Sequence, residues 1–233
     1  MVDNLDKTAE LVLNDKIDTS VIKNKSKKIV YHVIKRIFDI LVALVGLIIL
    51  IPITLIIKII TMFNKDFHSI FYTQERIGKN GKLFKFYKFR SMVPNADEVL
   101  FKLLKEDKEL AKEYKKMKKL ENDPRITKIG KFLRKTSIDE LPQVLNILKG
   151  DMSVVGNRPY LPREKKDMGK YYNDIIKTKP GLTGFWQVSL RSSGTFLERM
   201  KMEQYYSNNC GLKFDISLFL KTFKIVLKMN GAK

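Results

Sequence analysis

Two adjacent carboxylates, Asp139 and Glu140, stand near the start of a predicted helix in the stretch "KTSIDELPQVLNILKG". Ser137 precedes Glu140 by three residues, which is the spacing of a capping box, and Asp139 could itself be the N-cap residue. Pro142 then falls in the first turn, where its missing N–H costs little. A helix N-terminus also stabilises an ionised carboxylate through its dipole and free N–H groups. The pattern therefore predicts either an ordinary helix cap or a carboxylate presented as a nucleophile or metal ligand.

Three arginines lie in short polar or turn contexts around this pair. They are Arg134 in "FLRKTS", Arg158 in "GNRP" and Arg191 in "SLRSSG". The planar guanidinium group binds phosphate through two parallel hydrogen bonds. Each arginine alone is more often part of a surface ion pair. Three of them near a carboxylate pair predict a diphosphate site.

The charge of the chain points to an anionic partner. The 233 residues contain 45 Lys and Arg against 25 Asp and Glu, a formal net charge of +20. Such a surplus indicates nucleic acid, phosphorylated small molecules or an acidic membrane surface. The one cysteine, Cys210, excludes an internal disulfide, and the two isolated histidines, His32 and His68, argue against a histidine-based metal site.

One apolar segment follows a polar beginning. Residues 1–30 are expected to form a polar or basic tail, whose first 18 residues fit either a polar tail or a short helix. Residues 31–63 include the uncharged run Ile40–Ile57, which reaches the length threshold of a membrane-spanning helix. A cleaved signal peptide fits poorly, because no small-residue cleavage site follows the run. Asp39 is costly in lipid unless it meets a cation, and the basic pair one turn earlier could supply one.

Pro52 lies inside the apolar run, where it removes one backbone hydrogen bond. A plain spanning helix can tolerate this. However, Lys35 and Arg36 flank one end and Lys58 and Lys65 the other, and positive residues mark the cytoplasmic side. We therefore expect a re-entrant helix–break–helix, broken at Pro52, that enters and leaves the membrane by the same face.

The remaining pattern predicts an α+β fold that is mainly helical with a small β-hairpin. The hairpin pairs Ile70–Arg76 with Leu83–Phe89 around the turn "GKNG". The closing helix is predicted as either a core helix or an interfacial amphipathic helix lying on lipid. The other predicted elements are helices Ala96–Leu120, Lys128–Lys135, Asp139–Leu148, Leu161–Ile176, Thr195–Tyr206 and Phe214–Met229, and a short strand Phe185–Leu190.

Five segments in order resemble one known family. They are "KRIFDILVALVGLIILIPITLI", "FYTQERIGKNGKLFKFYKFRSM", "DPRITKIGKFLRKTSIDELPQVLNILKGDMSVVGNRP", "KPGLTGFWQV" and "FDISLFLKTFKIVL". The chain resembles the monotopic phosphoglycosyl transferases, the bacterial polyprenyl-phosphate sugar-1-phosphate transferases, from Tyr31 to Leu227. It corresponds to their minimal catalytic form. Two departures are Asn157, where the family usually has proline, and "SLRSSG", where glycine and asparagine usually flank the arginine.

The resemblance implies a covalent mechanism. Asp139 attacks the β-phosphate of a UDP-sugar, UMP leaves, and polyprenyl phosphate (usually undecaprenyl phosphate) then takes the sugar-1-phosphate from the aspartate. An aspartate with an ordinary pKa of about 3.9 is ionised at pH 7 and needs no base to attack. Glu140 would act as acid/base group or, with Asp139, as ligand of Mg²⁺, which prefers carboxylate and phosphate oxygens.

The resemblance also assigns binding residues and a location. Residues 64–233 would form a catalytic domain at the cytoplasmic face of the bacterial inner membrane, in contact with lipid. A monomer and a homodimer both stay open. The product would enter capsule, exopolysaccharide, O-antigen or glycoprotein synthesis. The substrate- and phosphate-binding residues would be Arg134, Arg158, Arg191, Lys88, Arg90, Ser91 and Gln187.

Two alternatives stay open from the residues alone. A non-catalytic membrane adaptor would share the apolar segment and the basic surface. A membrane-tethered nucleic-acid-binding protein would use the net charge and the aromatic residues of "FKFYKFR". The resemblance implies that the protein has no nucleic acid partner. The sequence does not indicate which sugar is transferred.

Overall fold

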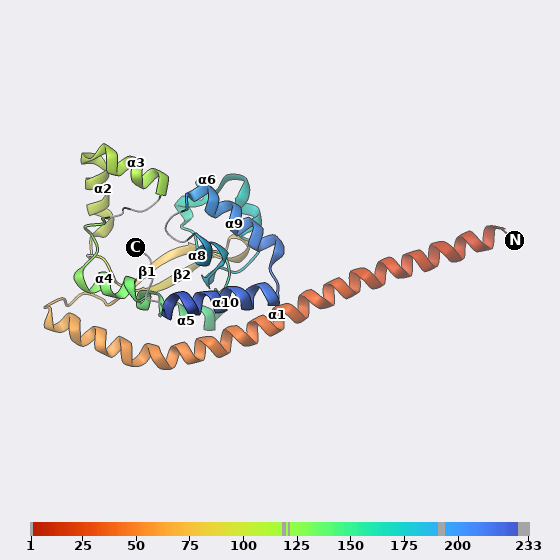
Figure 1. The fold of residues 1–233 in the computed structure, drawn as a ribbon, viewed down its shortest axis with the longest axis horizontal. Helices are drawn as coiled ribbons and strands as arrows, with labels where there is room; N and C mark the ends of the chain where they lie inside the picture. Colours follow the sequence, from red (N-terminus) through yellow and green to blue (C-terminus); the bar gives the residue numbers. More distant parts are fainter. Residues whose placement is uncertain (1, 118–119, 121, 191–193, 228–233) are drawn as a thin grey trace. The chain divides into compact units, whose positions relative to one another are not determined.

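The computed structural model describes residues 2–117, 120, 122–190 and 194–227. The chain divides at Phe38 into two units, and the second unit, residues 39–233, contains both small sheets and nearly all the short helices (Figure 1). The described residues form a mainly helical α+β structure, so the predicted fold class is confirmed.

Helix α1 (Val2–Phe63) is one uninterrupted helix with Pro52 inside it. Residues 2–30, predicted as a tail, are therefore helical, and the predicted backbone break at Pro52 is absent. A proline in a helix removes one hydrogen bond, and the helix can accommodate this by bending. Figure 1 draws α1 as a curved, continuous coil over its last third. Re-entry into the membrane stays a prediction.

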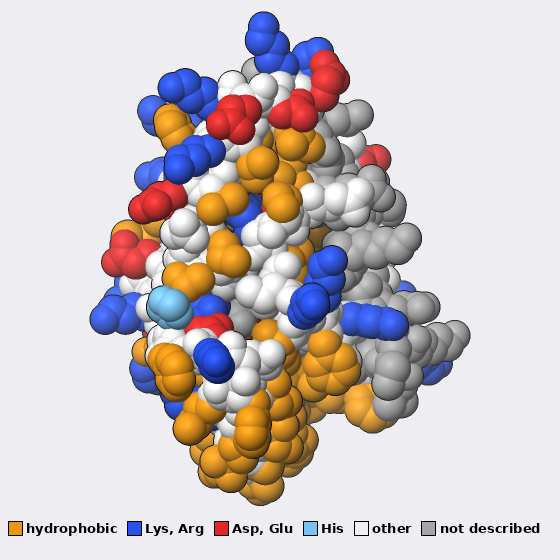
Figure 2. Space-filling model, turned by 90° about the vertical axis from the view of Figure 1, so that its left-hand side faces the viewer, with side chains coloured by type: hydrophobic (Ala, Val, Ile, Leu, Met, Phe, Trp, Pro, Cys, Tyr) orange, Lys and Arg blue, Asp and Glu red, His pale blue; other side chains and the backbone are white. Residues whose placement is uncertain are grey.

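From Asp39 onward α1 has a packed side and an apolar, exposed side. Its buried residues recur at helical spacing and are Asp39, Ala43, Leu50, Ile57 and Thr61. A Cβ on Gly46 would lie 2.6 Å from Val144, so this glycine allows close packing against α5 (Gln143–Lys149). Figure 2 shows hydrophobic side chains gathered at the lower end of the molecule. The exposed residues of α1 include Leu41, Val45, Ile48, Ile51, Leu55 and Phe63.

Asp39 is buried at 3% exposure. Its Oδ1 accepts hydrogen bonds from Ser153 Oγ at 2.9 Å and from the Val154 N–H at 2.8 Å. A buried carboxylate needs such partners, and these two come from strand β3 (Ser153–Val155). The carboxylate therefore joins α1 to β3 within residues 39–233.

Strands β1 (Phe71–Ile77) and β2 (Leu83–Phe89) form the predicted antiparallel hairpin, shifted by one residue at β1. Directly paired residues share a face of the sheet. One face therefore carries Tyr72 with Lys88, Gln74 with Phe86, and Arg76 with Phe84. The turn contains the 3₁₀ helix η1 (Lys79–Gly81).

The charged helix predicted for Ala96–Leu120 is two helices, α2 (Ala96–Glu106) and α3 (Lys108–Met117). Asp107 between them is extended, and its carboxylate accepts from the Glu109 and Leu110 N–H groups. Asp107 therefore caps the start of α3, which the continuous helical pattern of the sequence concealed.

A second sheet pairs β3 (Ser153–Val155) with β4 (Gly181–Thr183) in parallel. The strand predicted at Phe185–Leu190 is wrong, because Phe185–Ser189 forms helix α8. The true strand lies earlier and needs close backbone contact. A Cβ on Gly181 would lie 2.1 Å from the backbone nitrogen of Gly156.

The helix predicted for Leu161–Ile176 is divided at Gly169, which has φ +51. Left-handed backbone of this kind favours glycine and interrupts a helix. The region consists of η3 (Pro162–Glu164), α6 (Lys165–Met168), η4 (Gly169–Tyr171) and α7 (Tyr172–Ile175). A hydrophobic cluster packs this region against β1 and α9, and it comprises Ile77, Tyr160, Met168, Ile175 and Met200.

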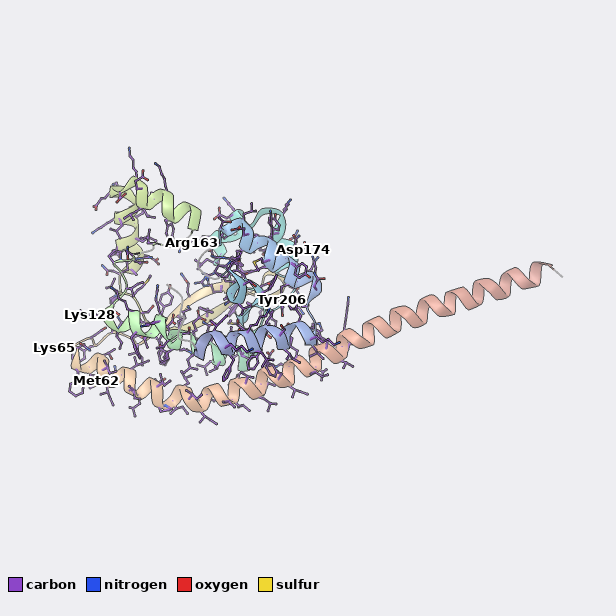
Figure 3. All side chains as sticks on the ribbon, in the orientation of Figure 1. Met62, Lys65, Lys128, Arg163, Asp174 and Tyr206 are labelled. Atoms are coloured by element: carbon purple, nitrogen blue, oxygen red, sulfur yellow. The ribbon has the colours of Figure 1, made fainter. Side chains whose placement is uncertain are left out.

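Two longer helices close the described chain. Helix α9 (Phe196–Asn209) begins with a capping box between Thr195 and Glu198, and α10 (Leu212–Leu227) follows. The Tyr206 hydroxyl, labelled in Figure 3, donates to Asp215 Oδ1 at 2.7 Å and joins the two helices. Leu218 of α10 is fully buried, whereas Ile216, Leu220 and Phe223 are exposed. The helix thus has a core side and a second apolar side; Met229 lies outside the described residues.

Candidate active site

The carboxylate pair lies on the 3₁₀ turn η2 (Ile138–Glu140), between α4 (Lys128–Lys135) and α5. Ser137 has left-handed backbone, with φ 59 and ψ 14, and its side chain makes no capping hydrogen bond. The predicted capping box is therefore wrong: the backbone carbonyl of Ser137 accepts from the Glu140 N–H. Asp139 is not the N-cap either, because α5 begins only at Gln143.

Lys88 of β2 brings a positive charge to both carboxylates. Its Nζ donates to Glu140 Oε1 at 3.0 Å and lies 3.5 Å from Asp139 Oδ2. Asp139 is 6% exposed, while the Glu140 side chain is about one third exposed. The pair thus consists of one buried and one accessible carboxylate joined by an ammonium group.

Burial raises the pKa of Asp139 above its ordinary value, and the charge of Glu140 adds to the rise. The charges of Lys88 and Arg134 oppose it. A carboxylate that is largely buried next to cations can act as an oxygen nucleophile once it is ionised. The site therefore suits attack on an electrophile that itself carries negative charge.

Arg134 lies on α4 and is held by Ser91. Its Nε donates to Ser91 Oγ at 2.9 Å. Burial lowers the pKa of Arg134, and the negative charge of Asp139 opposes this shift, which places the two groups in one electrostatic cluster. The close packing depends on Gly130, since a Cβ there would lie 1.9 Å from the Ser91 carbonyl oxygen.

Asn146 fixes the position of β2 relative to α5. Its Nδ2 donates to the Lys85 carbonyl at 2.6 Å, and its Oδ1 accepts from the Tyr87 N–H at 3.1 Å. The residue is fully buried. Because Lys88 follows on the same strand, this amide sets how closely Lys88 approaches the carboxylate pair. Sequence reasoning did not single out Asn146.

A buried ion pair, Asp123 with Arg125, was also missed. Arg125 contacts the carboxylate twice, with Nε at 2.8 Å and Nη2 at 2.6 Å. The Arg125 carbonyl accepts from the Val93 N–H at 2.9 Å, so the pair anchors the segment that follows Ser91. The tripeptide Asp-Pro-Arg before α4 was the available signal.

Several predicted residues have hydrogen-bond partners other than the carboxylate pair. The Arg90 guanidinium donates to Asp66 Oδ2 at 2.7 Å and to the Ser69 carbonyl at 2.6 Å. The Gln187 amide donates to the Leu182 carbonyl at 3.2 Å. Arg158 belongs to a different group of charges, and Arg191 lies outside the described residues.

Asp139 and Glu140 offer a donor set that Mg²⁺ uses. No group of three or more His, Cys, Asp or Glu capable of holding a metal occurs among the residues that the structure describes. Mg²⁺ typically binds one or two carboxylates and completes its coordination with water and substrate phosphates. The pair therefore fits a magnesium ion held jointly with a diphosphate.

The structure thus combines a carboxylate pair, with cations beside it, and a long apolar helix. Among the described residues, Lys28–Phe63 of α1 is the one helix stretch long and apolar enough to cross a membrane. The cations around Asp139 suit a phosphorylated substrate.

The chain belongs to the bacterial sugar transferase family, whose sequence model matches residues 30–229. It is 44% identical to the undecaprenyl-phosphate galactose phosphotransferase of Salmonella typhimurium over 91% of this chain and 44% of that protein. It is 43% identical to the galactosyl transferase CpsE of Streptococcus agalactiae over 90% of this chain and 45% of that protein. The exopolysaccharide production protein ExoY of Sinorhizobium fredii is 40% identical over 85% of this chain and 87% of its own length. The chain thus spans less than half of the first two relatives and most of the third.

Proposed function

We propose that this protein transfers a sugar-1-phosphate from a UDP-sugar to undecaprenyl phosphate, through a covalent intermediate on Asp139. The observation that carries the proposal is the buried Asp139 carboxylate with Lys88 Nζ 3.5 Å from its Oδ2. Family membership and the printed names of the relatives support the substrate classes.

In the first step, a carboxylate oxygen of Asp139 forms a bond to the β-phosphorus of the UDP-sugar. The bond from this phosphorus to the bridging oxygen breaks, and UMP leaves with the electron pair. In the second step, a phosphate oxygen of the lipid acceptor attacks the same phosphorus. The bond to Asp139 breaks, which regenerates the carboxylate and yields undecaprenyl-diphosphate-sugar.

The neighbouring residues have separate tasks in this scheme. Lys88 keeps Asp139 ionised and offsets the negative charge of the incoming phosphate. Arg134, oriented by Ser91, faces the charge that develops on the phosphoryl oxygens. A bound Mg²⁺ would supply further charge neutralisation at the diphosphate. Glu140 is the accessible carboxylate that would share in holding it.

The two sides of α1 support a membrane placement. From Asp39 to Thr61 its buried side packs on the rest of residues 39–233, and its other side is apolar and exposed. A helix stretch packed in this way fits a monotopic arrangement, in which the domain would stay at the cytoplasmic face. The exposed apolar residues of α10 would lie at the same lipid interface.

The test is UMP release by the full chain in detergent or lipid nanodiscs, with Mg²⁺, undecaprenyl phosphate and a panel of UDP-sugars. UDP-galactose is included first because the relatives from Salmonella typhimurium and Streptococcus agalactiae are named for galactose. Release with at least one donor supports the proposal. Release with none of them would contradict it and favour a non-catalytic adaptor. The variant Glu75→Gln, which alters an exposed carboxylate on β1, should behave as the unmodified chain.

A further inference from the structure

A second group of charges lies outside the carboxylate site. Three arginines from separate elements come together here: Arg76 on β1, Arg158 after β3, and Arg199 on α9. Burial lowers the pKa of Arg76 to about 10 and also lowers that of Arg199, and the charge of Arg158 acts in the same direction on both. The contacts agree with this, because Arg76 Nη1 donates to the carbonyl of Pro159, next to Arg158, and the Arg158 N–H donates to Glu203 of α9, one turn from Arg199.

These charges have no matching counter-ions in the described part of the chain. Among the described residues, none of the three guanidinium groups forms an ion pair with a carboxylate. The Nε atoms of all three are buried without a hydrogen-bond partner. Arg199 is the extreme case, because it is 5% exposed. Buried charges are ordinarily paired, so this arrangement requires an explanation.

Two nearby carboxylates, Glu164 and Glu203, offset the three positive charges only in part. Glu164 Oε2 accepts a hydrogen bond from the Leu161 N–H at 2.7 Å, and Glu203 Oε1 accepts one from the Arg158 N–H at 3.2 Å. Burial raises the pKa of Glu203 to about 7, against the opposing charge of Arg199, so part of its population is neutral near pH 7. The cluster therefore keeps a net positive charge.

The arginine cluster adjoins the carboxylate site along one face of the hairpin. Arg76 Cζ lies 5.3 Å and Lys88 Nζ 5.6 Å from the centre of the same Phe86 ring. Arg76 is held in this direction, because its Nη2 donates to Gln74 Oε1 at 2.8 Å and its Nη1 to the Pro159 carbonyl at 3.1 Å. Arg76 and Arg158 are only partly buried, so an anion can approach them.

We propose that Arg76, Arg158 and Arg199 form a second anion subsite beside the carboxylate pair, which binds a phosphate monoester. A phosphate monoester carries nearly two negative charges at pH 7 and offers three acceptor oxygens, which suits three converging guanidinium groups. The inference rests on the proposed function for the source of this group, which is either the released nucleoside monophosphate or the lipid acceptor's phosphate.

The structure contains its own reporter for this subsite. Trp186 is the one tryptophan of the 233 residues, and its ring centre lies 3.9 Å from Arg199 Cζ. Stacking on a cation affects indole fluorescence, so an anion that pairs with Arg199 should change the emission of Trp186. The chain, held in a detergent that does not contribute to the tryptophan emission, would be titrated with UMP, inorganic phosphate and a short-chain polyprenyl phosphate. Uncharged uridine serves as the control ligand.

The expected result is a saturable emission change with a phosphate monoester and none with uridine at the same concentrations. Arg158→Gln and Arg76→Gln should each weaken the affinity about tenfold to a hundredfold, as loss of a charged hydrogen-bond donor does. Lys102→Gln, an exposed lysine on α2, should leave it unchanged. Tighter binding of UMP would identify the nucleotide as the source, and tighter binding of polyprenyl phosphate the acceptor.

The proposal is overturned if no phosphate monoester changes the emission, or if both glutamine variants bind as the unmodified chain does. Two partly exposed positions are used because a change at buried Arg199 could impair folding. The titration needs no turnover of a UDP-sugar, so it can fail while the proposed transfer stands, or succeed while the transfer fails.

Discussion

Lys88 Nζ lies 3.5 Å from Asp139 Oδ2, and this ion pair joins a hairpin strand to the turn that carries the proposed nucleophile. The ammonium group counters the effect of burial, which would otherwise keep a proton on Asp139. The account of the site therefore depends on the placement of β2 as much as on the carboxylates.

Replacing Lys88 should shift the pH dependence of transfer. Asp139 must be ionised to attack, so activity falls as the pH drops through its raised pKa. In Lys88→Met the opposing charge is gone, and the acid limb of the pH–rate profile should move to higher pH. The rate at neutral pH should fall about 10²-fold. Lys85→Met, an exposed lysine on the same strand, should leave the profile unchanged; equal profiles for both variants would remove Lys88 from the mechanism.

Asp139→Asn should stabilise the folded chain while it abolishes transfer. Because the folded-state pKa of Asp139 lies above its unfolded value, the fold is favoured when this group is protonated. That contribution is lost as the pH rises through the folded-state pKa. The amide is neutral at every pH, so the variant should have a higher Tm near neutral pH, on the order of 2–4 °C for 1 kcal/mol. The difference should shrink as the pH falls toward 3.8. A lower Tm at neutral pH would show that Asp139 is mainly structural.

The carboxylate pair and Arg134 were predicted from local pattern, because unusual residue types stand close together in that stretch of the sequence. Lys88 and Ser91 lie far from this stretch in the chain and were expected only from the family resemblance. The structure brings Lys88 to the carboxylate pair and Ser91 to Arg134. The hairpin and α4 were also predicted to within one residue. The left-handed Ser137 was not, since a polar residue before two acids has the same pattern as a cap.

Other features could not be predicted because they depend on pairing between distant segments. The β3–β4 pair depends on close contact between Gly156 and Gly181. The sequence around either glycine gives no signal that the two segments pair. The arginine cluster likewise unites residues from three elements. Such clusters become visible only when the fold brings the charges together.

Gly130→Ala should disrupt the site through its backbone. The added Cβ would meet the Ser91 carbonyl oxygen at 1.9 Å, so α4 must move away and carry Arg134 with it. We expect a loss of stability of about 3 kcal/mol, at the upper end for overpacking, together with a marked loss of transfer. Gly211→Ala is the matched control, because no atom lies within 4 Å of its Cβ position. Thermal unfolding and UMP release measured on both variants decide the point.

Asn146→Leu should separate β2 from α5. The change leaves the Lys85 carbonyl and the Tyr87 N–H without their partner, at about 1–3 kcal/mol for each unsatisfied group. Transfer should fall further than stability alone explains, because Lys88 loses its fixed distance to Asp139. Asn173→Leu alters an exposed asparagine and should change neither property. Full activity in folded Asn146→Leu would contradict the positioning role.

The most direct test of the covalent mechanism is the mass of the protein after incubation with its UDP-sugar donor and Mg²⁺, without lipid acceptor. The account predicts an added sugar phosphate on the peptide that contains Asp139, released on addition of undecaprenyl phosphate and absent from Asp139→Asn. UMP formation that requires the lipid acceptor, with no adduct on Asp139, would instead show direct transfer between the two substrates and contradict the account.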